Sequence, residues 1–329
     1  MLRILHDTNY DFIRWWKVMA VVTIAFILLG IGSLAIKPPN YSIEFTGGTL
    51  MQLEFAQPPD VGVVRSTLDE AGIRGAEIQQ FGTNKEFTVR VQNAAAVASQ
   101  SKGAENVAVA IESVLKKKFG DNNVTVKRTE AVSARVGDEF KRGAIIAILL
   151  SFLITLVYLS IRFEWRFAAA AVIATSHDVF TTIAFLKLMH LEISLTVVAG
   201  LLTVLGYSLN DTIIIFDRVR ENLRKGRKET LYETLNRSIN ETLPRSVLTH
   251  ATTFAATLAL LLFAGEVIRP FAWVMAFGIV TGTFSSIYVA APVLLWIERK
   301  WPRKTGVRQP SSTATPTSRT TRSPVTATR

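Results

Sequence analysis

Long uninterrupted apolar segments are the feature of this sequence that most limits its fold. A helix needs about 20 mostly apolar residues to cross the hydrocarbon core of a bilayer. Residues 18–36 contain no charge and follow a basic and aromatic stretch, 14–17, of the kind found at membrane interfaces. Five more segments are similarly apolar: about 143–161, 167–186, 195–216, 247–264 and 271–297. The sequence therefore predicts a polytopic α-helical membrane protein with six transmembrane helices.

The first apolar segment could instead be a cleaved signal peptide. Ser33-Leu34-Ala35 resembles a small-residue cleavage site. The apolar part of a signal peptide usually has about 7–15 residues, and residues 18–36 form a longer one. We therefore expect an uncleaved membrane anchor.

The basic residues predict how the chain is oriented. The formal net charge is +11, which in a soluble protein would suggest a nucleic-acid partner. Here the basic residues flank the apolar segments, as in a protein whose short cytoplasmic loops are positive. The segment between the fourth and fifth spans is the most basic: Arg218, Arg220, Arg224, Lys225, Arg227, Lys228, Arg237 and Arg245. We expect no nucleic-acid partner, both termini in the cytoplasm, and residues 37–142 on the outer side.

The outward segment, 37–142, has the pattern of a small folded domain. Alternating stretches predict strands at 44–55, 76–81, 86–91 and 124–129, and helical spacing predicts helices at 61–71 and 105–119. This order matches the ferredoxin-like α+β fold. The segment has no histidine, the chain has no cysteine, and the acids are scattered. We therefore expect no enzyme activity, no cofactor and no metal.

The last segment, 298–329, is a basic cytoplasmic tail. Beyond Trp301 it consists mainly of Ser, Thr, Pro and Arg, a composition that predicts disorder. Its arginines could bind lipid head groups or ribosomal RNA, but a solvated tail is the simpler interpretation.

Two carboxylates lie inside predicted spans. A charged side chain at the centre of a bilayer costs about 2.5–3.5 kcal/mol on insertion scales, so such residues usually face a bundle interior. Asp178 and Asp211 each carry this cost. Helical spacing places Gly200 and Asp211 on one face of the fourth span, which we expect to face the fifth. The alternative for both acids is a structural contact that only joins helices. His177 and His250 could titrate near neutral pH, or be ordinary hydrogen-bonded residues.

Three stretches of the sequence resemble the SecF members of the SecD/SecF family. Phe45-Thr46-Gly47-Gly48 is similar to the signature that follows the first span. Residues 205–212 and 216–222 resemble the fourth-span signature closely, and residues 176–179 also fit. The family usually has Gly and Asp where this chain has Ser42 and Glu44. We interpret the glycine pair as a backbone bend, because no Lys-Ser/Thr follows to make a phosphate loop.

The resemblance implies a function and a set of residues. It implies a bacterial inner-membrane subunit that works with SecD and uses the proton motive force to promote preprotein export through the SecYEG channel. It also implies proton coupling by Asp211, Arg245 and Asp178. Helix packing or titration would then involve Asn210, Tyr207, His250 and Thr249. We expect Arg245 to hold the charged form of Asp211, with His250 as the alternative partner.

Two other functions fit parts of the pattern. The chain could be a half-size proton-driven exporter of lipids or drugs from the same resistance-nodulation-division superfamily, although such proteins normally have a larger outward domain. It could also be a passive scaffold, which Asp211 and Arg245 disfavour.

Overall fold

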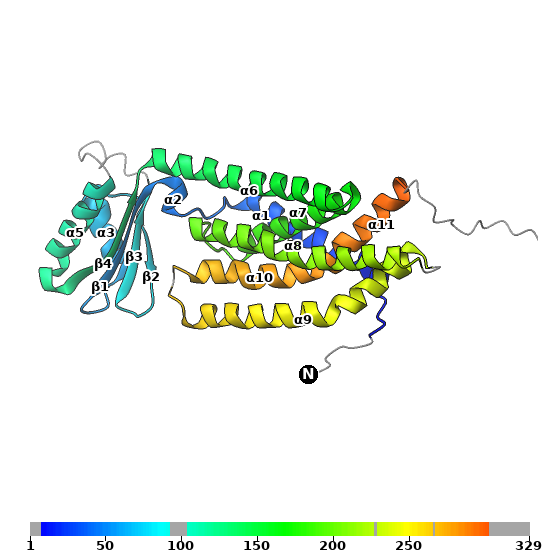
Figure 1. Ribbon diagram of the computed structural model, residues 1–329. Coiled ribbons are helices and arrows are strands. Elements are labelled where there is room, and N and C mark those ends of the chain that lie inside the picture. Colours follow the sequence, from blue (N-terminus) through cyan, green and yellow to red (C-terminus); the bar gives the residue numbers. More distant parts are fainter. Residues whose placement is uncertain (1–7, 93–103, 227–228, 266, 303–329) are drawn as a thin grey trace, which may run out of the picture.

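Six long helices form the larger part of the protein. Figure 1 shows the computed structural model, which describes residues 8–92, 104–226, 229–265 and 267–302. Within these residues, six helices are long and apolar enough to cross a membrane, as predicted. They are α1 (Trp16–Ile36, preceded by a 3-10 turn, Ile13–Trp15), α6 (Ala134–Arg162), α7 (Trp165–Leu188), α8 (Leu195–Arg224), α9 (Leu231–Phe263) and a last helix built from α10 (Arg269–Ser285), a π-helical turn (Ser286–Ala290) and α11 (Ala291–Lys300). The predicted tail lies mostly outside the described residues.

Helix α9 begins well before the apolar segment from which it was predicted. The Thr230 hydroxyl accepts the backbone N–H of Glu233, and the Glu233 carboxylate accepts the backbone N–H of Thr230. This capping box satisfies orphan donors at a helix start. Arg245 therefore lies inside a continuous helix, with about four turns of α9 before it.

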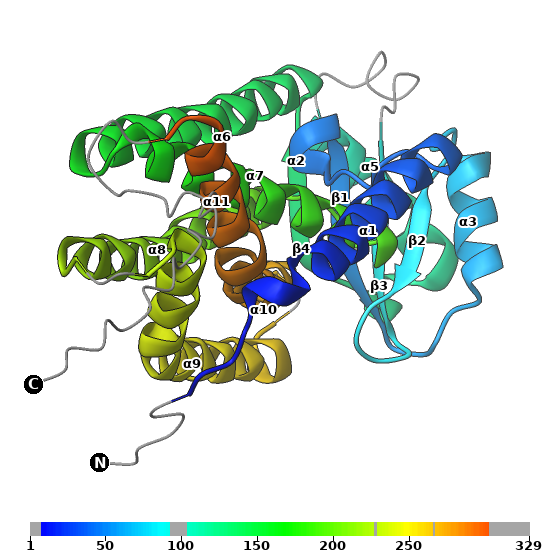
Figure 2. The ribbon, with the colours of Figure 1, turned by 90° about the vertical axis from the view of Figure 1, so that its right-hand side faces the viewer.

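Three helices form the centre of the bundle. In the most apolar 18-residue stretches of α7, α8 and the α10–α11 helix, at least half of the residues are buried. In the corresponding stretches of α1 and α6, only 6% of the residues are buried. In Figure 2, α6 lies at the top of the bundle and α9 at the bottom, with α7 and α11 between them. Polar residues such as Asp178 of α7, Ser208 of α8 and Ser285 of α10 are thus held in the protein interior.

Glycines allow α8 and α10 to pack closely. A Cβ atom on Gly278 would lie 2.2 Å from Val204 Cγ2, and one on Gly282 would lie 3.1 Å from Ser208 Cβ. Gly200 likewise packs against Val274 of α10. Small residues commonly permit such approaches between membrane helices. Our expectation that Gly200 faces the fifth span was wrong, because α10 occupies that side.

The domain between α1 and α6 is a four-stranded antiparallel sheet with two helices. Its elements are β1 (Gly48–Phe55), α3 (Val61–Glu70), β2 (Glu77–Gln80), β3 (Glu86–Val91), α5 (Ala104–Phe119) and β4 (Val124–Val132). The strand order is β2-β3-β1-β4. Met51, Leu53, Phe55, Val89 and Ile111 are among its buried core. The predicted order of elements is present, and the ferredoxin-like class stays a prediction.

The first predicted strand is shorter than expected, because it is preceded by a helical turn. Residues Ile43–Thr46 form α2, and the strand starts at Gly48. Gly47 and Gly48 have φ values of +71° and +134°, which residues with a Cβ rarely adopt. The glycine pair therefore makes the predicted bend, between a short helix and a strand.

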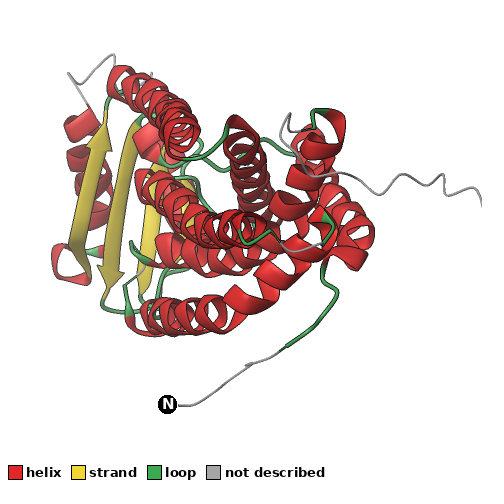
Figure 3. Ribbon diagram, turned by 45° about the vertical axis from the view of Figure 1, so that its right-hand side comes forward, coloured by secondary structure: helices red, strands yellow, loops and turns green. Residues whose placement is uncertain are grey.

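The sheet lies between its own helices and the membrane bundle. Helices α3 and α5 cover the face of the sheet that is turned away from the bundle (Figures 1 and 3). Helix α6 starts at Ala134 and runs from this domain into the bundle. The domain is therefore attached through α2, α6 and the ends of the neighbouring membrane helices.

Candidate functional site

Asp211 of α8 faces α9 and contacts a serine there. Asp211 is only 4% exposed. Its Oδ1 atom accepts a hydrogen bond from Ser246 Oγ of α9. In the described part of the chain its other oxygen, Oδ2, has no hydrogen-bond partner. A buried carboxylate with an unused acceptor atom can take up a proton without first breaking a bond to its neighbour.

The two predicted partners of Asp211 lie near it but do not bond to it. Arg245 is exposed, and Asp211 takes part in no ion pair within 4 Å among the described residues. His250 is buried, and its Nδ1 atom donates to the Ser246 carbonyl oxygen over 2.6 Å. His250 Nε2 has no partner in the described chain. Ser246, which the sequence did not single out, is therefore the residue that joins Asp211 to α9.

Tyr207 connects the same two helices about one turn away. Its hydroxyl oxygen lies 3.1 Å from both the Thr249 carbonyl oxygen and Thr253 Oγ1. Its ring meets the His250 ring edge to face, with centroids 5.3 Å apart. The structure thus brings Asp211, Tyr207, His250 and Thr249 together, whereas Asn210 is exposed on α8.

Asp178 of α7 forms a second polar centre, and hydroxyl groups surround it. Asp178 is fully buried. Its Oδ2 atom accepts hydrogen bonds from Ser208 Oγ of α8 at 2.5 Å and from Ser285 Oγ of α10 at 2.7 Å. Its Oδ1 atom lies 3.1 Å from His177 Nδ1. Three central helices are therefore joined at one carboxylate, an arrangement that satisfies a buried acid well.

The Asp178 centre continues into the π-helical turn of the last helix. Thr212 Oγ1 of α8 lies 2.8 Å from Ser286 Oγ, the first residue of that turn. π-helical turns inside α-helices occur frequently at functional sites. Ser208 and Ser285, which bond to Asp178, and the bonded pair Thr212 and Ser286 were not predicted as site residues. Isolated hydroxyl residues in an apolar helix give no signal of what they face.

The site fits proton exchange better than metal or acyl chemistry. In the described residues there is no group of three or more His, Cys, Asp or Glu side chains that could hold a metal ion. Asp178 and Asp211 are the acids buried in the spans, and hydroxyl groups are their hydrogen-bond donors. A hydroxyl can donate to a carboxylate and can also accept from a protonated acid. The arrangement can therefore hold both protonation states of either acid.

Comparisons with known proteins identify the family. The family model "Protein export membrane protein SecD/SecF, C-terminal" matches residues 110–300, and the "SecD/SecF GG Motif" model matches residues 32–59. The protein translocase subunit SecF of Gemmatimonas aurantiaca is 60% identical over 305 residues, which cover 92% of this chain and 91% of that protein. The chain belongs to the SecF family of protein translocase subunits.

Other members of the SecF family and a solved structure agree with this. The SecF subunit of Vibrio alginolyticus is 41% identical over 289 residues, covering 88% of this chain and 90% of that protein. The crystal structure of SecDF, a translocon-associated membrane protein from the genus Thermus, is 33% identical with a TM-score of 0.79. That match covers 91% of this chain and 40% of the SecDF chain. The chain therefore has the fold of the SecF part of SecDF and is a multi-pass inner-membrane protein.

The SecF signature lies at the bend described above. Phe45 and Thr46 end α2, and Gly47 and Gly48 lead into β1. Phe45 is 3% exposed, and a Cβ on Gly47 would lie 2.7 Å from Ala134 Cα, at the start of α6. In this member of the SecF family the signature therefore joins the sheet domain to the membrane helices.

Proposed function

We propose that this SecF-family chain works with a SecD subunit, uses the proton motive force, and promotes preprotein export through the SecYEG channel. The observation that carries the proposal is an exposed polar strip on two membrane-crossing helices. It consists of five polar residues, Thr203 and Asn210 of α8 and Arg245, Thr249 and Thr252 of α9, together with the exposed Gly206 of α8. Polar and ionisable residues in a membrane normally face protein or a water-filled cavity. The strip is thus better suited to a second membrane subunit than to lipid.

Arg245 gives the strongest reason to expect that subunit. In the described chain its guanidinium group has no ion pair or hydrogen bond, and it lies one residue from Ser246, the partner of Asp211. An arginine inside a membrane protein needs a carboxylate, backbone carbonyl or water as a partner. A SecD subunit on the strip would supply groups for Arg245 and would close the proton site around Asp211. The exporter and scaffold alternatives have no observation of their own in their favour.

Site-specific crosslinking tests the partner. We expect a photo-crosslinking residue at Asn210 to form an adduct with SecD in whole membranes, because Asn210 lies on the polar strip. The matched control is Leu29 of α1, which is 65% exposed on an apolar surface and should react with lipid only. SecYEG should be recovered in the same complex. Adducts at Leu29 and none at Asn210 would contradict this position for SecD.

Reporter fusions test the orientation. We propose that both termini are cytoplasmic and that the sheet domain is outside, because the segment between α8 and α9 is strongly basic. A reporter inserted at Gly82, in the turn between β2 and β3, should be active on the outer side. A reporter fused at Arg308 should be active in the cytoplasm. Activity of both reporters on the same side would reject this topology.

A further inference from the structure

The outward domain is attached to the start of α8 by a glutamate from the signature region. Leu195, the first residue of α8, donates its backbone N–H to Glu44 Oε2 at 2.6 Å. Ser42 Oγ lies 3.2 Å from the same oxygen. Glu44 belongs to α2, which is 151 positions earlier in the chain. A carboxylate is favourable at a helix N-terminus because the free N–H groups and the helix dipole are positive there.

An arginine of the sheet attaches to the same place. Arg90 of β3 is 7% exposed and forms an ion pair with Glu192, in the segment between α7 and α8. It also lies 3.7 Å from Glu77 of β2. The backbone of Ile193 donates to Asn40 O at 2.7 Å and accepts from Ser42 N at 2.9 Å. We call these contacts of residues 192–195 with Asn40, Ser42, Glu44 and Arg90 the junction.

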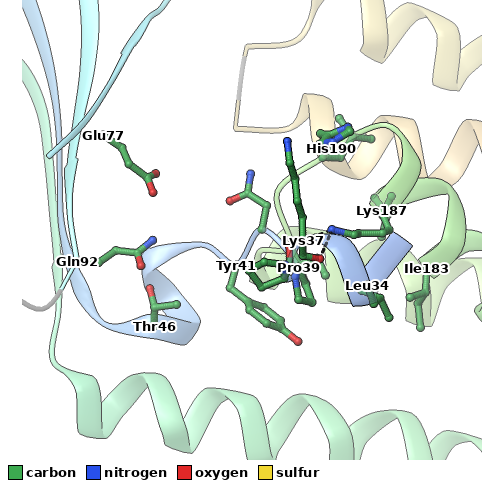
Figure 4. Close-up of a pocket in the computed structure, with 15 residues that line it drawn as sticks. Leu34, Lys37, Pro39, Tyr41, Thr46, Glu77, Gln92, Ile183, Lys187 and His190 are labelled. Carbon is green, nitrogen blue, oxygen red and sulfur yellow. Dashed lines mark hydrogen bonds between the residues drawn. The ribbon is translucent and has the colours of Figure 1, made fainter. Parts of the chain in front are cut away.

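Beside the junction the domain and the membrane helices are separated by a cavity of about 520 Å³. Glu77 and Gln92 point into it from the sheet, and Leu34, Ile183 and Lys187 line it from the ends of α1 and α7 (Figure 4). Because the two parts are not packed together across this space, the domain has room to tilt. The junction is the point at which it remains connected to α8.

We infer that the junction transmits a movement of α8 to the outward domain, and that Glu44 and Arg90 are its positioning residues. The inference rests on the proposed function, in which the proton motive force acts at Asp211, and it adds that a change of protonation there moves α8. Asp211 lies about 24 Å along the same helix from Leu195, at 1.5 Å per residue. A shift or rotation of α8 therefore displaces residues 192–195 and pulls on Glu44 and Arg90.

Helix α2 contacts both α8 and α6, so a movement of α8 turns it against α6. On one side its Glu44 is bonded to α8, and on the other it packs on α6, where a Cβ on Gly137 would lie 3.0 Å from Phe45 O. Backbone packing of this kind leaves no room for sliding, so α2 pivots on α6 when α8 moves. Gly47 and Gly48 then carry the change directly into β1, the strand between β3 and β4.

Charge variants of the junction test the inference. The chain with SecD and SecYEG is assayed in membrane vesicles for preprotein export with and without a proton gradient. Spin labels on cysteines placed at Asn84 and Val267 report the distance between the domain and the outer end of the bundle, since the chain has no cysteine of its own. The variants are Glu44→Ala, Arg90→Glu, Glu192→Arg and the exchanged pair Arg90→Glu/Glu192→Arg. The controls are Glu70→Ala and Arg74→Glu, which change exposed residues of the same domain.

We expect Glu44→Ala to lower gradient-dependent stimulation about tenfold, since losing a hydrogen bond to a charged group shifts an equilibrium by at least that factor. Export without a gradient should be unchanged, and the spin-label distances should broaden. Arg90→Glu should behave similarly. The exchanged pair should restore part of both signals, because it rebuilds the ion pair with position 192 while Glu77 still faces an acid at position 90. The controls should match the parent chain.

The outcomes separate this inference from the function on which it rests. If Glu44→Ala and Arg90→Glu keep full stimulation while Asp211→Asn loses it, the junction has no transmitting role and the proposed function stands. If the exchanged pair fails to restore a signal that Arg90→Glu removes, the ion pair is not the connection, and the inference is overturned for Arg90. If Asp211→Asn keeps full stimulation, the proposed function itself fails.

Discussion

Replacing Asp211 with asparagine is expected to abolish the stimulation of export by a proton gradient while leaving the chain folded in the membrane. Asparagine has nearly the same shape and can still accept the hydrogen bond from Ser246, but it cannot take up a proton. One proton crossing 100 mV supplies about 2.3 kcal/mol, which is enough to change an equilibrium constant more than tenfold. The measurement is preprotein export in vesicles at fixed ATP, with and without a gradient.

A matched acid on the same helix controls for charge. Asp217 is exposed near the end of α8, and Asp217→Asn should leave the stimulation unchanged. His250→Ala and Arg245→Lys should each reduce it only in part, because neither residue bonds to Asp211. If His250→Ala removes the stimulation and Asp211→Asn does not, the histidine carries the proton and our assignment of Asp211 is wrong.

The two buried acids differ in ways that bear on their roles. Asp178 has hydrogen-bond partners on both oxygens and joins α7, α8 and α10. It lies where α8 and α10 pack closely together, at Ser208 and Gly282. Asp211 has one partner, lies between α8 and α9, and borders the exposed strip that contains Arg245. A change of protonation at Asp178 would disturb several hydrogen bonds, whereas one at Asp211 affects a single contact. We therefore propose Asp211 as the changing group and Asp178 as its fixed support.

The membrane helices were predictable because one physical requirement determines them. Crossing a bilayer demands a long apolar helix, so hydropathy locates each span. The polar first half of α9 was not predictable this way, since Thr230 and Glu233 start a helix outside any apolar segment. Hydropathy therefore locates the apolar part of α9 but not the start of the helix, which lies 14 residues before Arg245.

The partners of the acids could not be predicted, because they depend on how helices rotate against one another. Spacing on a single helix shows that Asp211 and Tyr207 share a face, but it cannot show that Ser246 faces them. The contact of Glu44 with Leu195 joins two residues that are 151 positions apart in the chain. Its only signal was an acid next to the glycine pair, which equally suits an exposed turn.

Replacing Gly48 with alanine is expected to destabilise the sheet domain more than any other addition of a single methyl group to it. Gly48 has φ of +134°, and a Cβ there would lie 2.5 Å from the backbone oxygen of Val91. A backbone oxygen cannot turn aside like a flexible side chain, so β1 and β3 must separate where they pair. The strained backbone alone costs about 1–3 kcal/mol, and the contact adds to it. Total stability is about 5–15 kcal/mol for a typical protein, so the domain should lose most of its resistance to proteolysis.

Gly75→Ala separates the two causes. Gly75 also has a positive φ, +74°, but nothing lies within 4 Å of a Cβ built there. It should therefore show only the backbone penalty, about 1–2 kcal/mol, and remain protected. Limited proteolysis of the full chain in membranes across a urea series measures both variants together with the parent. If the two variants lost equal amounts of stability, the positive φ of the backbone alone would explain the need for glycine at position 48. A much larger loss for Gly48→Ala would mean that position 48 excludes a Cβ more strictly than an ordinary left-handed turn does, through its φ of +134° and its close approach to the Val91 oxygen.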